Sequence, residues 1–146
     1  MSKLDRYVMT FLRFFVLFVV GGLIYASIEI IYRGYTHWTM VILGGLCFTS
    51  IGEINEFLSW DTPLLLQMLI SSVIVTALEF ICGCVLNLWL HLNIWDYSNL
   101  PFNVLGQICL PFTVVWYFLS LLAIVYDDYF RYVYFKEEKP RYKLLC

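Results

Sequence analysis

Four long runs of apolar residues follow one another along almost the whole chain. A helix needs about 20 mostly apolar residues to cross the hydrocarbon core of a bilayer. Backbone polar groups in hydrocarbon must pair within their own segment, so each run should be helical. Of the 146 residues, 62% are hydrophobic and only 14% are charged, too few charges to cover a water-facing surface. We therefore predict an all-α protein, a polytopic integral membrane bundle with four transmembrane helices over residues 8–31, 38–57, 63–90 and 104–126.

The basic residues predict how these spans are oriented. Loops on the cytoplasmic side carry an excess of Lys and Arg. Lys3 and Arg6 precede the first span, whereas residues 59–62 and 91–103 contain neither residue type. We therefore expect a multi-pass protein of the cell membrane with both termini in the cytoplasm. The chain from residue 127 onward carries five further basic residues: Arg131, Lys136, Lys139, Arg141 and Lys143.

Residues 1–146 are predicted to form a single membrane domain, whose last part leaves the bilayer. Residues 127–146 mix aromatic side chains with charges of both signs. This composition is typical of an amphipathic segment at a membrane surface. We expect the fourth helix to continue into a cytoplasmic, interfacial tail. Aromatic residues near the predicted span ends should form interfacial belts; they are Trp38, Trp60, Trp95 and Tyr97.

Polar residues inside the predicted spans form stripes at helical spacing. Ionisable groups in a membrane are costly, and they normally face the interior of the bundle. Tyr25 and Glu29 share one face of the first span, and Glu29 and Glu79 are expected to converge in the outer half. The third span carries the longest stripe, at spacings of three and four residues: Ser72, Thr76, Glu79, Gly83, Asn87 and His91.

These carboxylates have two interpretations, which the sequence leaves open. They bind a cation, a proton or a cationic group, or they hold the bundle together through hydrogen bonds to hydroxyls such as that of Tyr25. Glu53 and Glu56 lie near the predicted inner interface and are expected to be solvated. Arg13 is the clear cation within a span and is expected to extend toward the interface.

The stretch between the third and fourth spans, "LNIWDYSNLPFNVLGQICLPF", predicts a structured loop. Its Asp, Ser, Asn and Pro residues favour turns. Asn103 is predicted to cap the fourth helix, Gln107 to lie in its first turns, and Pro111 to kink it. Trp95 and Phe102 should pack onto the bundle, and Asp96, Asn103 and Gln107 should bond inward. The candidate ligand- or ion-binding residues are then Glu79, Glu29, Asn87, Asp96, Tyr25, Asn103 and Gln107.

Three consecutive motifs, "EFICGCVLN", "IWDYSNLPFNVLGQICLPF" and "VWYFLSLLAI", resemble the family named "Putative ABC-transporter type IV". The resemblance is strong over residues 76–124. It implies a small bacterial multi-span membrane protein with a permease-like role. The sequence has no GxxxxGK[ST] phosphate-binding loop, so an ATPase would have to be a separate subunit.

Three functions fit these observations. The first is a transport component, permease-like or transport-associated, with carboxylates lining the bundle interior. The second is a structural or regulatory membrane subunit whose loop docks a partner. The third is a membrane enzyme acting on a lipid-borne substrate, with Glu29, Glu79 and Asp96 as acid and base. No HExxH or GxSxG motif supports the enzyme, so the sequence favours a non-enzyme.

The expected partners follow from the same features. They are the lipid bilayer and either a second copy of this chain or a separate membrane or ATPase subunit. Four spans are few for a transporter that works alone. The net charge of −2 and the absence of a basic patch argue against nucleic acid. No cofactor and no metal site are predicted.

Overall fold

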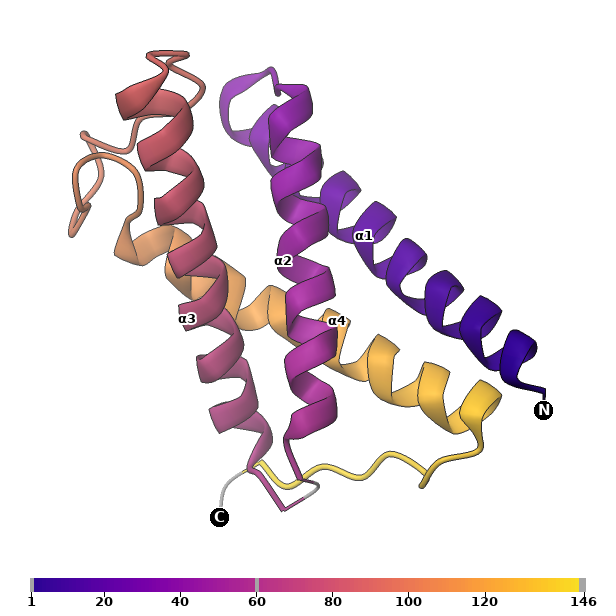
Figure 1. Cartoon of the computed structure of the whole chain (residues 1–146). Coiled ribbons are helices and arrows are strands. Elements are labelled where there is room, and N and C mark those ends of the chain that lie inside the picture. The colour runs from indigo at the N-terminus through magenta and orange to yellow at the C-terminus, as the bar shows by residue number, and fades with distance from the viewer. Residues whose placement is uncertain (1, 60, 145–146) are drawn as a thin grey trace.

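The computed structural model describes residues 2–59 and 61–144, and within them it is built from helices without strands. Its helices are α1 (Lys3–Arg33), α2 (Trp38–Phe57), α3 (Leu64–Gly83), the short π-helix η1 (Cys84–Trp89) and α4 (Leu110–Phe135) (Figure 1). The four long helical segments, with α3 and η1 taken together, are apolar enough to cross a membrane. This confirms the predicted all-α membrane bundle. Trp60 and the last two residues of the predicted tail lie outside the described residues.

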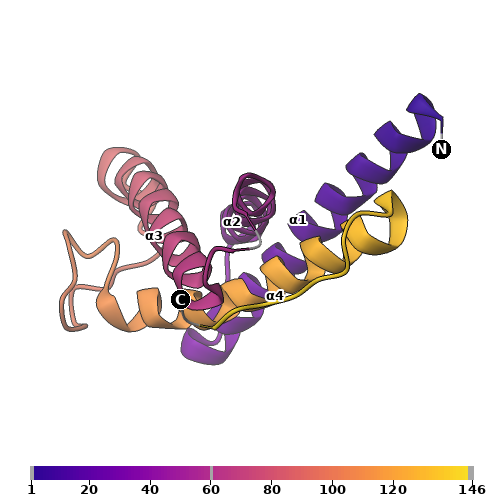
Figure 2. The same cartoon turned by 90° about the horizontal axis from the view of Figure 1, so that it is seen from below.

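The helices place the connections at two opposite ends of the molecule. The beginning of α1, the α2–α3 connection and residues 136–144 lie at one end, which we name the termini end (Figure 1). Residues 34–37 and 90–109 lie at the other, the loop end. Figure 2, seen from below, shows residues 136–144 running under the bundle toward α3. There the Leu64 amide donates to the carbonyl of Lys143 at 2.5 Å.

Local sequence explains where α1 and α2 begin and end. Ser2 and Asp5 form a capping box, in which each side chain accepts a hydrogen bond from the other residue's amide at 3.1 Å. α1 ends at Gly34, whose φ of +83° is a conformation that glycine adopts without strain. The ring of His37 accepts from the Thr39 amide at 3.3 Å and so caps α2. α2 therefore has the predicted bounds, 38–57.

The beginning of α4 differs from the prediction. Residues 104–109 belong to the loop, where Val104 and Ile108 form an isolated antiparallel bridge, and the helix begins only at Leu110. The extended residue Cys109 is its N-terminal boundary, so the prediction that Asn103 caps this helix is wrong. Pro111 lies in the first turn, where no amide hydrogen is needed, so it starts the helix and does not kink it.

α1 and α2 pack most extensively against each other because glycines face glycines. A Cβ atom added to Gly44 would lie 2.5 Å from the carbonyl oxygen of Gly21 and 2.6 Å from Cβ of Tyr25. A Cβ on Gly21 would collide with the Gly44 carbonyl in turn. Small residues at such an interface let two membrane helices approach until their backbones touch. This close approach brings Tyr25 to the centre of the bundle.

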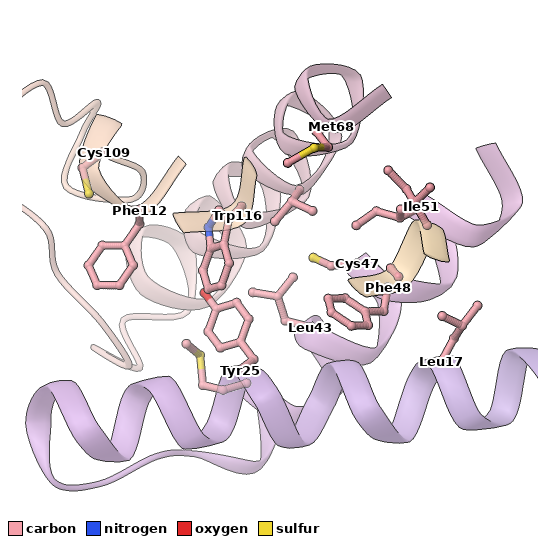
Figure 3. Close-up of a cluster of buried hydrophobic side chains, with 14 of the residues drawn as sticks. Leu17, Tyr25, Leu43, Cys47, Phe48, Ile51, Met68, Cys109, Phe112 and Trp116 are labelled. Carbon is pink, nitrogen blue, oxygen red and sulfur yellow. The ribbon is translucent and has the colours of Figure 1, made fainter. Parts of the chain in front are cut away.

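The centre of the bundle is filled by side chains from every long helix. Leu17, Leu43 and Ile51 are at most 2% exposed and lie among the clustered side chains of Figure 3. The outward faces are also apolar: Phe11, Phe118 and Ile81 are each more than half exposed. A surface of this kind suits hydrocarbon and not water.

Candidate functional site

Glu79 lies at the polar centre of the bundle, on the inward face of α3. It is 1% exposed. Its Oε2 accepts a hydrogen bond from the Tyr25 hydroxyl and a longer one, at 3.4 Å, from the Tyr97 hydroxyl. Among the described residues, no cation lies within ion-pair distance of this carboxyl group. We name Glu79, Tyr25 and Tyr97 the Glu79 centre.

Aromatic rings from α4 hold both tyrosines in place. The Tyr25 ring stacks on Trp116 with centroids 4.9 Å apart, a pair that Figure 3 shows side by side. The Tyr97 ring stacks on Phe112, also at 4.9 Å. The adjoining interior cavity, lined by Tyr25 and Trp116, measures about 10 Å³. A cavity of that size is barely enough for one water molecule. This cavity beside Tyr25 therefore has no room for a solute, and Glu79, Tyr25 and Tyr97 are each at most 3% exposed.

Tyr97 was predicted at the membrane interface, and the structure corrects this. It is 2% exposed and reaches from the loop down to Glu79. Burial raises the pKa of its hydroxyl far above the ordinary value, with the nearby carboxyl of Glu79 adding to the shift. The hydroxyl therefore stays neutral and donates. Trp95 is buried as expected, whereas Phe102 is 79% exposed, so the prediction that it packs down is wrong.

Glu29 is close to this centre but has its own partner. It is 2% exposed, and its Oε2 lies 2.6 Å from Nε of Arg33, one turn later on α1. The Arg33 guanidinium also donates to the backbone carbonyl of Ile94. Arg33 thus neutralises Glu29 and ties the end of α1 to the loop. Glu29 and Glu79 were expected to converge. In the structure each has its own partner: Glu29 pairs with Arg33, and Glu79 accepts from Tyr25.

Asn87 and Gln107 meet and fix the ends of the loop. The Asn87 amide donates to Oε1 of Gln107 at 2.8 Å, and its Oδ1 accepts from the Ile94 amide at 2.6 Å. Gln107 is 3% exposed, and its backbone carbonyl accepts from the indole of Trp95 at 3.0 Å. Gln107 lies outside the helix that was predicted to contain it. The hydrogen bonds of Asn87 and Gln107 therefore fix the conformation of the loop formed by residues 90–109.

Asp96 and Asn103 bond within the loop itself. Oδ1 of Asp96 accepts from the amide and the hydroxyl of Ser98, and these bonds lower the pKa of this exposed carboxyl. The Asn103 amide donates to the Leu100 carbonyl at 2.9 Å, and its Oδ1 accepts from the Gly106 amide at 3.2 Å. The prediction that these two side chains bond inward is therefore wrong.

The structure reveals a second polar cluster at the termini end, built around Asp127. Asp127 is fully buried, and its two oxygens lie 3.3 Å from Nε of Arg13 and 3.2 Å from Nε of Arg131. Arg13 also pairs with Glu56. Asn55 donates to Asp127 at 3.1 Å. We name these five residues the Asp127 network.

The Asp127 network joins three helices to the C-terminal segment. Two of its members, Asn55 and Arg131, also contact Asp128, at 2.7 and 2.8 Å. Asp128 in turn accepts from the Tyr142 hydroxyl at 2.8 Å. One sequence-based expectation is corrected here. Arg13 is 2% exposed and paired, so it does not extend freely to the interface. α4 continues through Phe135, so the first part of the predicted tail is helical, and both aspartates of α4 are buried.

A signal for this network exists in the sequence. Ala123, Ile124 and Asp127 come three, four and seven residues after Ser120, so the four residues share one face of a helix. All four are buried. A buried cation on the first span, Arg13, needs a carboxylate partner, and this face supplies one.

Comparison with known proteins supports the resemblance over nearly the full chain. The model of one family, described as "Putative ABC-transporter type IV", matches residues 7–143. No curated protein and no solved structure matched the chain. The match covers the Glu79 centre, the loop and the Asp127 network alike. This membrane protein of four apolar helices therefore belongs to the family described as "Putative ABC-transporter type IV".

Proposed function

We propose that this chain is a transport-associated membrane subunit that works in an assembly with other chains. Its family name connects it to transport systems. The sequence holds no phosphate-binding loop of the GxxxxGK[ST] type, so an ATPase has to come from outside this sequence. The single domain would lie in the cell membrane with the termini end in the cytoplasm. The clustering of basic residues near the two ends of the sequence supports that orientation.

The observation that carries this proposal is the closed interior around Glu79. A carboxyl group lining a substrate path needs open space beside it, and the cavity next to Tyr25 measures about 10 Å³. We therefore propose that a solute path, where there is one, runs between this bundle and a neighbouring chain. The mass of the particle extracted from the native membrane tests this proposal, because an assembly is heavier than the chain alone.

The loop end offers a surface for such a neighbour. Phe102 is 79% exposed and Leu105 is 65% exposed, on a loop that Asn87 and Gln107 hold in a fixed shape. Exposed apolar side chains on an ordered loop are typical of contact sites. This observation also favours the second candidate function, a regulatory subunit that docks a partner through its loop.

The role of Glu79 separates a structural centre from a proton-carrying permease. We expect Glu79→Gln to change the free energy of unfolding by less than about 1 kcal/mol, because the amide oxygen still accepts from both tyrosines. Glu79→Leu leaves the Tyr25 and Tyr97 hydroxyls buried without an acceptor, and it should cost about 2–4 kcal/mol. Unfolding in detergent by titration with sodium dodecyl sulfate measures both changes.

Proton flux provides the second measurement on the same variants. A pH-sensitive dye inside proteoliposomes reports proton entry when a membrane potential is applied. The structural role predicts equal flux for the wild type and Glu79→Gln. A flux that is present in the wild type and lost in Glu79→Gln, with stability unchanged, would support the permease and contradict the structural role.

A further inference from the structure

A polar cavity of about 370 Å³ lies at the termini end, apart from the Glu79 centre. The first turns of α1, the last turns of α2 and the end of α4 surround it. Figure 1 shows the beginning of α1 and the end of α4 lying at this same end of the molecule. Its volume falls in the range of small-molecule sites, about 300–1,000 Å³.

The inner wall of this cavity is charged, and its charged side chains pair with one another. Arg13 pairs with Glu56 and Asp127, and Arg131 lies 3.2 Å from both Asp127 and Glu137. Arg13 is 2% exposed, so this part of the wall is fixed by packing. These side chains shape the cavity, and each of them already has an ion-pair partner.

Two residues at the cavity keep unpaired charges of opposite sign. Arg6 on α1 and Glu53 on α2 both line it. Within residues 2–59 and 61–144, neither side chain makes an ion pair or a hydrogen bond. The guanidinium of Arg6 lies 5.2 Å from the centroid of the Phe135 ring, which also lines the cavity and holds the cation there. The free charges therefore sum to zero, as they do in a zwitterion.

We infer that this cavity binds a phosphate-containing zwitterion with a primary ammonium group. Arg6 would bind the phosphate, because a guanidinium recognises phosphate oxygens through paired N–H donors. Glu53 would accept hydrogen bonds from the ammonium. Two sources carry this chemistry: the headgroup of phosphatidylethanolamine and free phosphoethanolamine. Beside Arg6 the outward face of α1 is apolar, with Tyr7 74% and Phe11 65% exposed, which suits the acyl chains of a lipid.

Native mass spectrometry of the purified chain, titrated with defined short-chain lipids, tests this site. We expect phosphatidylethanolamine to bind at least about fivefold more tightly than phosphatidylcholine or phosphatidylglycerol. The quaternary ammonium of phosphatidylcholine has no N–H to donate to Glu53, and phosphatidylglycerol has no cation. Free phosphoethanolamine is then added as competitor. Displacement of the lipid shows that the headgroup suffices, and retention shows that the lipid form is required; both outcomes support the site.

Variants of the two free charges make the test specific. Arg6→Gln and Glu53→Gln should each weaken phosphatidylethanolamine binding about tenfold, the loss expected for one charge-assisted hydrogen-bonding partner. Both residues are exposed, so folding should be preserved. Lys3→Gln and Glu138→Gln remove exposed charges outside the cavity and should leave binding unchanged. Equal binding of the three lipids, or unchanged binding in Arg6→Gln and Glu53→Gln, would overturn the inference. The result does not depend on the assembly proposed above.

Discussion

Asp127→Ala is expected to lower the free energy of unfolding by about 3–5 kcal/mol, because it removes the buried carboxylate that Arg13 and Arg131 share. Asp127 is fully buried between Arg13 and Arg131, and Arg13 is itself 2% exposed. Without Asp127, Glu56 would be the one carboxylate of the network that still pairs with Arg13. Titration with sodium dodecyl sulfate, followed by tryptophan fluorescence, measures the loss.

Two further variants show whether the burial of Asp127 causes the expected loss of stability. Asp61→Ala removes a carboxylate whose side chain is 80% exposed and which pairs with Lys143 at 3.2 Å. An exposed pair of this kind is worth less than about 1 kcal/mol. The double variant Arg13→Ala with Asp127→Ala should cost less than the sum of the two single changes, since the pair couples them. An Asp127→Ala effect no larger than that of Asp61→Ala would contradict the proposed role of the network.

Gly44→Ala is expected to destabilise the bundle by about 1–3 kcal/mol, the cost of overpacking a close contact. The new Cβ would lie 2.5 Å from the backbone oxygen of Gly21, and a backbone atom on a packed helix cannot turn aside. Helix propensity acts in the opposite direction, because Ala is favoured over Gly by about 1 kcal/mol in a helix. The sign of the measured change therefore decides between packing and propensity.

The neighbouring glycine is the matched control for this prediction. The three atoms nearest to a Cβ on Gly45 would all belong to the Phe18 side chain, at 2.7 Å, and a side chain can move. Gly45→Ala should therefore cost less than Gly44→Ala in the same denaturation experiment. Equal effects at the two positions, or stabilisation by Gly44→Ala, would show that the α1–α2 backbones are not in contact.

The sequence predicted those features that depend on local pattern. The bounds of α2 follow from an apolar run of about 20 residues with His37 before it. The polar stripe on the third span identified Glu79 as an inward-facing residue. Tyr25 lies on the polar face of the first span, and its hydroxyl was named as a hydrogen-bond donor to the carboxylates. Periodicity reports which face of a helix is buried, so these contacts were accessible without a structure.

Features that depend on distant segments could not be predicted in the same way. Tyr97 belongs to an irregular loop, and no periodicity shows that it reaches Glu79. The partnership of Arg13 with Asp127 joins opposite ends of the chain, and the tail-like composition after residue 126 concealed it. The beginning of α4 was missed because Val104 and Leu105 continue the apolar run, while the backbone of Val104 pairs with that of Ile108 in a loop bridge.

The mass of the particle extracted from its native membrane tests the central claim most directly. The chain would be purified in a mild detergent through a small affinity tag, and native mass spectrometry would give its mass and its partners. We predict a complex of fixed stoichiometry that contains further membrane chains, because the interior cavity beside Tyr25, at about 10 Å³, is too small for a solute. A single 17.2 kDa chain without stoichiometric partners, active in transport on its own, would contradict the account.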